Sequence, residues 1–174
     1  EIFYPEENCM HTTNIIRNLC DWKESKSWSD DIDLVHWNAG IWDSLIMIDG
    51  KPLIKIDVYK ENIGRISDMI NMLFPLAKVI FATSTPVREE LFTTYKMYNH
   101  NTEKYNKVAC ESVIAHGGSI SDLYSLLRDV PAEFHSDRTH FYTKAATELI
   151  TNHTVGIIEK EMGIKAKKLD FDAL

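Results

Sequence analysis

Short apolar runs of strand length alternate along this chain with longer segments whose apolar residues recur at helical spacing. Leu34–Trp37 and Lys78–Ala82 are the clearest strands, and helical patterns follow them at Tyr59–Leu73 and Asn101–His116. This alternation predicts parallel strands joined by helices that cover both faces of the sheet. In such sheets ligands bind beyond the carboxyl ends of the strands, so polar residues that follow the strands are the first candidates for a site.

Apolar spacing and turn signals predict further elements. Near the N-terminus they are a strand at Ile2–Tyr4 and a helix that is capped by Thr12 or Thr13 and runs to about Trp22. A hairpin is expected around Asp49-Gly50, with arms at 46–48 and 53–56. Further along are a short strand at Ser119–Asp122 with a helical turn to Leu127, and a last helix at Thr143–Met162. The core side of that last helix comprises Ala146, Leu149, Ile150, Val155 and Ile157. We expect one domain over residues 1–163, with a loose tail at 164–174.

Composition narrows the possible partners and cofactors. The net charge is −7, so the surface repels phosphate backbones and no nucleic-acid partner is expected. No run approaches the ~18 apolar residues of a transmembrane helix, so no membrane partner is expected. Three widely spaced cysteines and no visible leader favour reduced thiols in a cytoplasmic compartment. No metal-ligand spacing and no nucleotide-binding glycine motif occur, so neither a metal nor another cofactor is expected.

Asp137 and His140 lie three residues apart just before the last helix. A carboxylate that accepts a hydrogen bond from one imidazole nitrogen holds the ring and leaves the other nitrogen as a base. Such a pair serves to activate a Ser or Cys nucleophile. A helix-entry Asp beside an ordinary surface His has the same spacing, so a purely structural role stays open.

The segment LVHWNAGIWD, residues 34–43, breaks from an apolar strand into Asn38-Ala39-Gly40. This break brings backbone N–H groups and an amide side chain to the strand tip, and these groups can form an oxyanion hole. The alternative is a simple turn, in which Gly40 adopts a left-handed conformation and Asn38 caps it.

Two other residues are weaker candidates for a nucleophile. Ser84 follows a strand but lacks the flanking glycines of a nucleophile elbow, and Thr85-Pro86 reads as a turn. Cys9 lies near a helix start, where a thiolate would be favoured, although a buried and inert cysteine is the simpler interpretation.

Taken in order, these segments resemble the carbohydrate-esterase-like branch of the SGNH/GDSL hydrolases. The resemblance covers residues 1–163 and includes EEN before the first helix, VHWNAGIWD, VIFATSTPV, SISDLY and SDRTHF. It implies a flavodoxin-like α/β fold, a three-layer sandwich with a mostly parallel sheet of about five strands. It also implies hydrolysis of esters, often of acetyl groups on sugars.

The resemblance also assigns roles to residues. His140 matches the general base and Asp137 its orienting carboxylate. Gly40 would donate a backbone N–H to the oxyanion, with a second backbone donor near Cys9. The family has an amide donor where this chain has Trp42, so the indole N–H of Trp42, or the amide of Asn38, would have to substitute.

The family's nucleophilic serine lies in a Gly-Asp-Ser motif after a first strand, and nothing in this chain matches it. In family order that strand lies between Ile2–Tyr4 and Leu34–Trp37. Its loss would leave buried edges with unpaired backbone groups, at about 1–3 kcal/mol per group. We therefore expect a longer polypeptide, or a second chain or segment, to complete the sheet; direct pairing of the two flanking strands would refute this.

The sequence thus favours a serine-type ester hydrolase that acts on a small-molecule or carbohydrate ester, with its serine upstream of this chain. A non-catalytic carbohydrate-binding or structural relative is the alternative, favoured by the missing serine and by Trp42. A flavodoxin-like binding or signalling domain is a third hypothesis, in which the pairing of Asp137 and His140 would be incidental.

Overall fold

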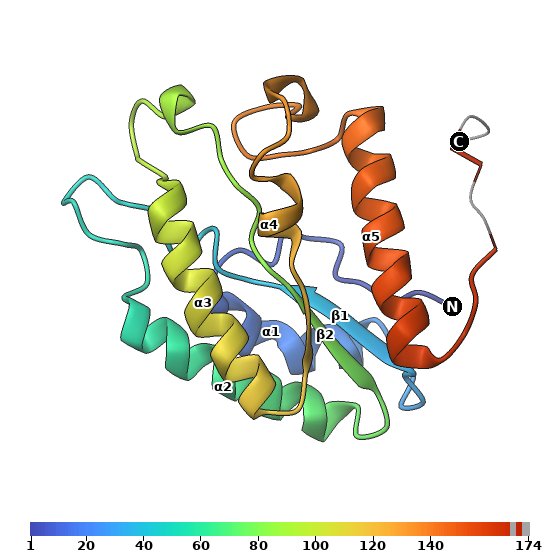
Figure 1. The fold of residues 1–174 in the computed structure, drawn as a ribbon. Helices are drawn as coiled ribbons and strands as arrows, with labels where there is room; N and C mark the ends of the chain where they lie inside the picture. Colours follow the sequence, from blue (N-terminus) through green and yellow to red (C-terminus); the bar gives the residue numbers. More distant parts are fainter. Residues whose placement is uncertain (168–169, 172–174) are drawn as a thin grey trace.

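Three parallel strands form the centre of the fold (Figure 1). The computed structural model describes residues 1–167 and 170–171. The strands are β1 (Leu34–Asn38), β2 (Lys78–Ala82) and β3 (Ser119–Ser121), and they lie side by side in the order β1-β2-β3. Since β1 pairs with β2, and β2 with β3, in parallel, all three carboxyl ends lie at the same edge of the sheet.

Helices connect the strands and flank the sheet. They are α1 (Thr12–Ser25), α2 (Ile56–Leu73), α3 (Asn99–Ala115), α4 (Leu123–Leu127) and α5 (Lys144–Met162), with 3-10 turns at Glu89–Leu91 and Ala132–Phe134. α2 connects β1 to β2, and α3 connects β2 to β3, so both crossovers follow the predicted pattern. Figure 1 shows α1, α2 and α3 on one side of the strands and α5 on the other. The α/β class with a parallel sheet is confirmed.

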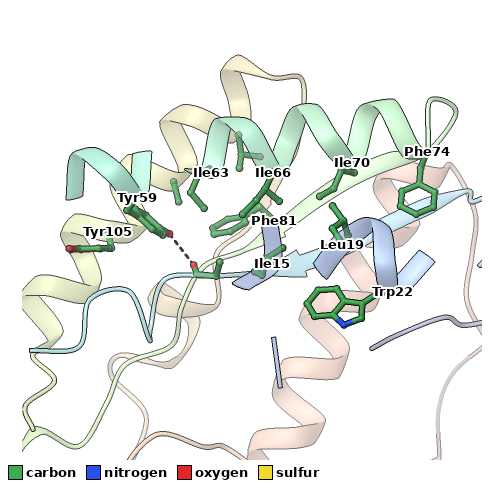
Figure 2. Packing of buried hydrophobic residues seen from close by; sticks show 13 residues of the cluster. Ile15, Leu19, Trp22, Tyr59, Ile63, Ile66, Ile70, Phe74, Phe81 and Tyr105 are labelled. Carbon is green, nitrogen blue, oxygen red and sulfur yellow. Dashed lines mark hydrogen bonds between the residues drawn. The ribbon is translucent and has the colours of Figure 1, made fainter. Parts of the chain in front are cut away.

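The helices pack in separate apolar clusters. α1, α2 and α3 share one cluster, and α4, α5 and Phe141 share another. Figure 2 shows Ile63 and Ile66 of α2 directed toward Phe81 of β2. Phe81 and its neighbour Ile80 are both 0% exposed, and successive strand residues point to opposite faces, so β2 is buried on both sides.

Two predictions near the N-terminus are wrong. Ile2–Tyr4 forms no strand, and both Ile2 and Tyr4 are exposed, because the backbone of this short run pairs with no strand among the described residues. Thr12 and Thr13 do not cap α1 either. His11 is the N-cap, and Thr12 is the first helical residue, with its hydroxyl committed to a buried contact described below.

The predicted hairpin around Asp49-Gly50 is reduced to a loop. A single antiparallel bridge joins Ile46 to Pro52, and Ile56 already begins α2. Pro52 has no N–H to donate to a ladder, so the arms cannot extend as strands.

The expectations for the C-terminal part are met only partly. Among the proposed core residues of α5, Ala146 is fully buried, whereas Leu149, Ile150, Val155 and Ile157 are half-buried. The resemblance implied about five strands, and the described residues form three. Residues 168–169 and 172–174 of the predicted tail lie outside the described residues. No helix in the described part of the chain is long and apolar enough to cross a membrane.

β1 has a free edge. Within the described residues no strand pairs with its side opposite β2, and Ile2–Tyr4 does not pair with it directly. A groove of about 970 Å³ lies there instead, lined by Ile2–Tyr4, by β1, and by side chains of α1 and α5 that include Trp22 and Ile158. The indole Nε1 of Trp37 is buried without a hydrogen-bond partner. These features leave room and unused backbone groups beside β1.

Candidate active site

The carboxyl ends of the strands open into a pocket of about 790 Å³. Its wall contains every residue that the sequence analysis selected for the site: Cys9, Asn38, Gly40, Trp42, Asp137 and His140. These residues come from the loop before α1, the end of β1 and its loop, and the turn before α5. The fold therefore brings together segments that are more than a hundred residues apart in the chain.

Asp137 and His140 form a hydrogen-bonded pair at this pocket. His140 Nδ1 lies 2.6 Å from Asp137 Oδ2, while Asp137 Oδ1 accepts the backbone N–H groups of Thr139 at 2.7 Å and of His140 at 2.8 Å. The Ser136 N–H and hydroxyl both donate to the His140 carbonyl, at 2.8 and 3.0 Å, which closes the turn. The short local sequence thus holds both partners of the pair in place.

Hydrogen bonds to this carboxylate favour its charged form. The backbone N–H of Thr139, above all, and then the contacts from His140 hold the pKa of Asp137 well below its usual range. An ionised carboxylate can only accept a hydrogen bond, so Nδ1 of His140 carries the proton in this contact. His140 Nε2 has no hydrogen-bond partner among the described residues and is free to accept a proton.

Ser84 also lies in the pocket wall, but its hydroxyl is used elsewhere. Its side chain is 3% exposed, and Oγ donates to the Ala39 carbonyl at 3.4 Å. The Asn106 side chain holds both the N–H and the carbonyl of Ser84, at 2.8 and 2.9 Å. Ser84 is therefore a structural link between strand ends and makes no hydrogen bond to His140.

Gly40 occupies a conformation that favours glycine. Its φ is +133°, and its carbonyl accepts the Ser44 N–H at 2.9 Å, which closes the turn after β1. Tyr59 supports this turn, with its hydroxyl donating to the Ala39 carbonyl at 3.0 Å (Figure 2). The Gly40 N–H donates to no described residue, so it remains available to a ligand in the pocket.

A buried carboxylate ties the Gly40 loop to the start of α1. Asp43 is 0% exposed, and its Oδ1 accepts the Thr12 hydroxyl at 2.5 Å and the Thr12 N–H at 3.1 Å. Asn62 of α2 donates to the same hydroxyl at 2.9 Å. Burial raises the pKa of Asp43 above its usual range, although the bonds from Thr12 oppose this shift. This network fixes the two loops that carry Cys9 and Gly40.

The remaining predicted hydrogen-bond donors differ in whether they already bond to another residue. Asn38 uses its Nδ2 to donate to the Ala82 carbonyl at 2.6 Å, which joins the ends of β1 and β2. Trp42 is half-buried, and its indole N–H has no partner among the described residues. The Cys9 backbone N–H is likewise unused, whereas burial, above all, and the nearby Glu7 raise the pKa of its thiol. Cys9 can thus donate a hydrogen bond from its backbone N–H, but its thiol does not ionise readily.

Arg138, Phe92 and Tyr95 are among the residues of the pocket wall that the sequence analysis did not select. Arg138 lines the pocket and lies between the predicted base and carboxylate in sequence, and Phe92 and Tyr95 pack around its guanidinium group. Arg138 could have been found, because it lies inside the motif that was already singled out. Phe92 and Tyr95 follow a 3-10 turn in a segment with no motif, so nothing in the sequence indicated them.

No group of three or more His, Cys, Asp or Glu side chains in the part of the chain that the structure describes is arranged to hold a metal ion. His140 offers an oriented imidazole base beside the unused backbone N–H groups of Gly40 and Cys9. Those groups are suited to transfer a proton and to stabilise a developing oxyanion.

Comparison with known proteins shows similarity in structure only. No protein-family model matches the chain, and no curated protein matches it by sequence at a significant level. Among solved structures, a lipase/acylhydrolase from Enterococcus faecalis superposes with a TM-score of 0.64 at 20% identity, covering 91% of this chain and 74% of that one. An acetyl-xylooligosaccharide esterase from a Geobacillus species gives 0.63 at 13% identity, with coverages of 92% and 71%.

A third solved structure, from Parabacteroides merdae and described as a GDSL-like lipase, gives a TM-score of 0.62 at 10% identity and covers 89% of this chain and 69% of that one. The chain thus spans about 70% of the length of these proteins. Identities at this level show a shared fold. The chain therefore has the fold of the SGNH/GDSL-type hydrolases.

Proposed function

We propose that this chain supplies the general base, its orienting carboxylate and the oxyanion donors of a serine-type ester hydrolase. The observation that carries the proposal is the 2.6 Å contact between His140 Nδ1 and Asp137 Oδ2 at the pocket, with Nε2 left unbonded. The fold supports it, since the structural neighbours are named as lipases, an acylhydrolase and an esterase.

The proposed reaction is a two-step acyl transfer. A serine hydroxyl attacks the ester carbonyl carbon, and its proton passes to His140 Nε2, while Asp137 stabilises the resulting imidazolium. The N–H groups of Gly40 and Cys9, with Trp42 or Asn38, stabilise the oxyanion. The imidazolium then protonates the departing alcohol. Water, deprotonated by the same nitrogen, hydrolyses the acyl-enzyme and releases the acid.

In this proposal the serine is delivered by a segment that adds to the free edge of β1. The groove of about 970 Å³ beside β1 has the apolar lining that a buried strand requires, and the backbone groups of that edge are unused. A parallel strand placed there would end at the same edge as β1, beside the pocket. The partly buried α5 supports this, because an added strand would cover its remaining apolar side chains.

The proposed substrates are small-molecule or carbohydrate esters, including acetyl esters of sugars. The named activity of the Geobacillus neighbour supports this choice. A pocket of about 790 Å³ is large enough for a ligand of that kind.

The proposal is tested with p-nitrophenyl acetate and the full-length protein. Replacing His140 with Ala removes the base, and kcat should fall by about 10²–10⁴-fold. His100→Ala is the matched control, because His100 is exposed on α3 and lies outside the pocket wall. Equal turnover in the two variants would rule out His140 as the base.

A non-catalytic carbohydrate-binding role is the second candidate. The observation that favours it is that no hydroxyl or thiol of the described residues is hydrogen-bonded to His140 Nε2. In that case the full-length protein would bind a sugar ester without consuming it, and His140→Ala would change its affinity but no rate. Measured turnover that depends on His140 would exclude this role.

A further inference from the structure

Arg138 carries a positive charge into the wall of the pocket. It lies between Asp137 and His140 in sequence, it lines the same pocket as both, and its side chain is half-buried. Its backbone carbonyl accepts the Arg88 N–H at 2.9 Å, which anchors this turn to the loop that follows β2. A long cationic side chain therefore lines the same pocket as the predicted base.

Aromatic rings hold the guanidinium group in place. Its central carbon lies 4.8 Å from the ring centroid of Phe92 and 5.0 Å from that of Tyr95, distances at which cations interact favourably with rings. One guanidinium nitrogen also donates to the Tyr95 hydroxyl. A fork held in this way loses little conformational freedom when it binds an anion.

The charge of Arg138 is not neutralised by the protein. Its hydrogen-bond partner is a neutral phenol, and no carboxylate of the described residues forms an ion pair with it. Asp137 is the one carboxylate in the pocket wall, and both of its oxygens are occupied by Thr139 and His140. The guanidinium therefore keeps donors for a group that comes from outside the chain.

We propose that Arg138 binds a carboxylate of the substrate, so that the pocket selects esters that carry a carboxylate group. This inference rests on the proposed ester hydrolysis and names its substrate class. A guanidinium fork matches a carboxylate in shape and charge and can bind both oxygens. Because the chain has a net charge of −7, a local cation is needed to attract an anionic substrate to this surface.

The test compares matched esters on the full-length protein. para-Acetoxybenzoate and its methyl ester differ only by a carboxylate on the alcohol side, and mono-p-nitrophenyl succinate and its methyl ester differ only by one on the acyl side. The pair in which the anionic ester reacts faster shows whether Arg138 faces the alcohol side or the acyl side of the ester. In the wild-type protein, kcat/KM should be higher for the anionic member of one pair. In Arg138→Gln this preference should fall by about tenfold.

Arg88→Gln is the matched control, since it removes the same charge from the neighbouring loop, where Arg88 already pairs with Glu90 at 2.8 Å. It should keep the wild-type preference, and Arg138→Lys should keep part of it. No preference in the wild-type protein, or a preference that survives in Arg138→Gln, would overturn the inference.

A binding measurement separates this inference from the proposed function. Calorimetric titration with succinate and with 4-hydroxybenzoate, neither of which contains an ester bond, requires no turnover, and binding to the wild-type protein should be lost in Arg138→Gln. If esters are not hydrolysed but this binding is seen, the hydrolase proposal fails and the carboxylate site stands. If hydrolysis is seen and neither anion binds, the carboxylate site is wrong.

Discussion

A Cβ atom at position 40 would lie 2.7 Å from the hydroxyl oxygen of Tyr59, closer than nonbonded atoms approach. Tyr59 cannot withdraw easily, because it is completely buried and its hydroxyl holds the Ala39 carbonyl at 3.0 Å. The loop that carries the unused N–H of Gly40 thus requires a residue without a side chain at this position.

Gly40→Ala should destabilise the protein and slow its reaction. A non-glycine residue at a φ of +133° costs about 1–3 kcal/mol, and the contact with Tyr59 adds to this. The free energy of unfolding in urea and kcat for p-nitrophenyl acetate report both effects. Gly50→Ala is the control, because Gly50 also has a positive φ, of 75°, but no atoms surround a Cβ there. The account fails if Gly40→Ala keeps the activity of Gly50→Ala.

Asp137→Asn should lower kcat by about 10²–10⁴-fold with little change in KM. An amide in place of the carboxylate cannot stabilise the imidazolium and can hold the ring in the wrong tautomer. Asp129→Asn is a suitable comparison, since Asp129 is exposed, pairs with Arg128 and lies outside the pocket wall. Steady-state rates that are equal for the two variants would contradict a role for Asp137.

The lowered pKa of Asp137 has a consequence for stability. Because the carboxyl binds its proton more weakly in the folded chain, its contribution is fully present above about pH 4, the ordinary pKa, and is lost as the pH falls through the lowered value. The difference in free energy of unfolding between the wild-type protein and Asp137→Asn should thus shrink on acidification. The effect should be small, because the Asp137 side chain is 51% exposed. Urea titrations of both proteins between neutral and acidic pH measure this difference in free energy of unfolding. A difference that grows on acidification would contradict the expected direction.

The strands and helices at the centre of the fold could be predicted because their own residues determine them. Lys78–Ala82 and the helix that ends at Leu73 have the apolar spacing of buried elements, and both were confirmed. Ile2–Tyr4 has a similar apolar content, but a strand needs a neighbour to pair with, and its pairing cannot be read from three residues. Boundaries were predicted less well, since α1 ends at Ser25 and not near Trp22, and α2 begins at Ile56 and not near Tyr59.

The pocket could be predicted in part for the same reason. Asp137 and His140 are three residues apart, so their contact is local and the sequence already indicated it. The link between Asp43 and Thr12 joins residues 31 positions apart, and no local pattern indicates it. The clamp of Arg138 between Phe92 and Tyr95 likewise depends on loops that meet only in the folded chain.

The buried network at Thr12 should prove important for stability. Thr12→Val keeps the shape of the side chain but removes the hydroxyl that donates to Asp43 and accepts from Asn62, leaving buried polar groups without partners. We expect a loss of about 1–3 kcal/mol in the free energy of unfolding. Thr12→Ser retains the hydroxyl and should lose less. Equal stabilities of the valine and serine variants in urea would show that the hydroxyl contributes nothing.

Covalent labelling with a fluorophosphonate, followed by peptide mass spectrometry of the full-length protein, shows whether His140 activates a serine. We expect one labelled serine, located on a segment outside these 174 residues, with a labelling rate that collapses in His140→Ala and persists in His100→Ala. A label on Ser84, or labelling that is indifferent to His140, would contradict the account.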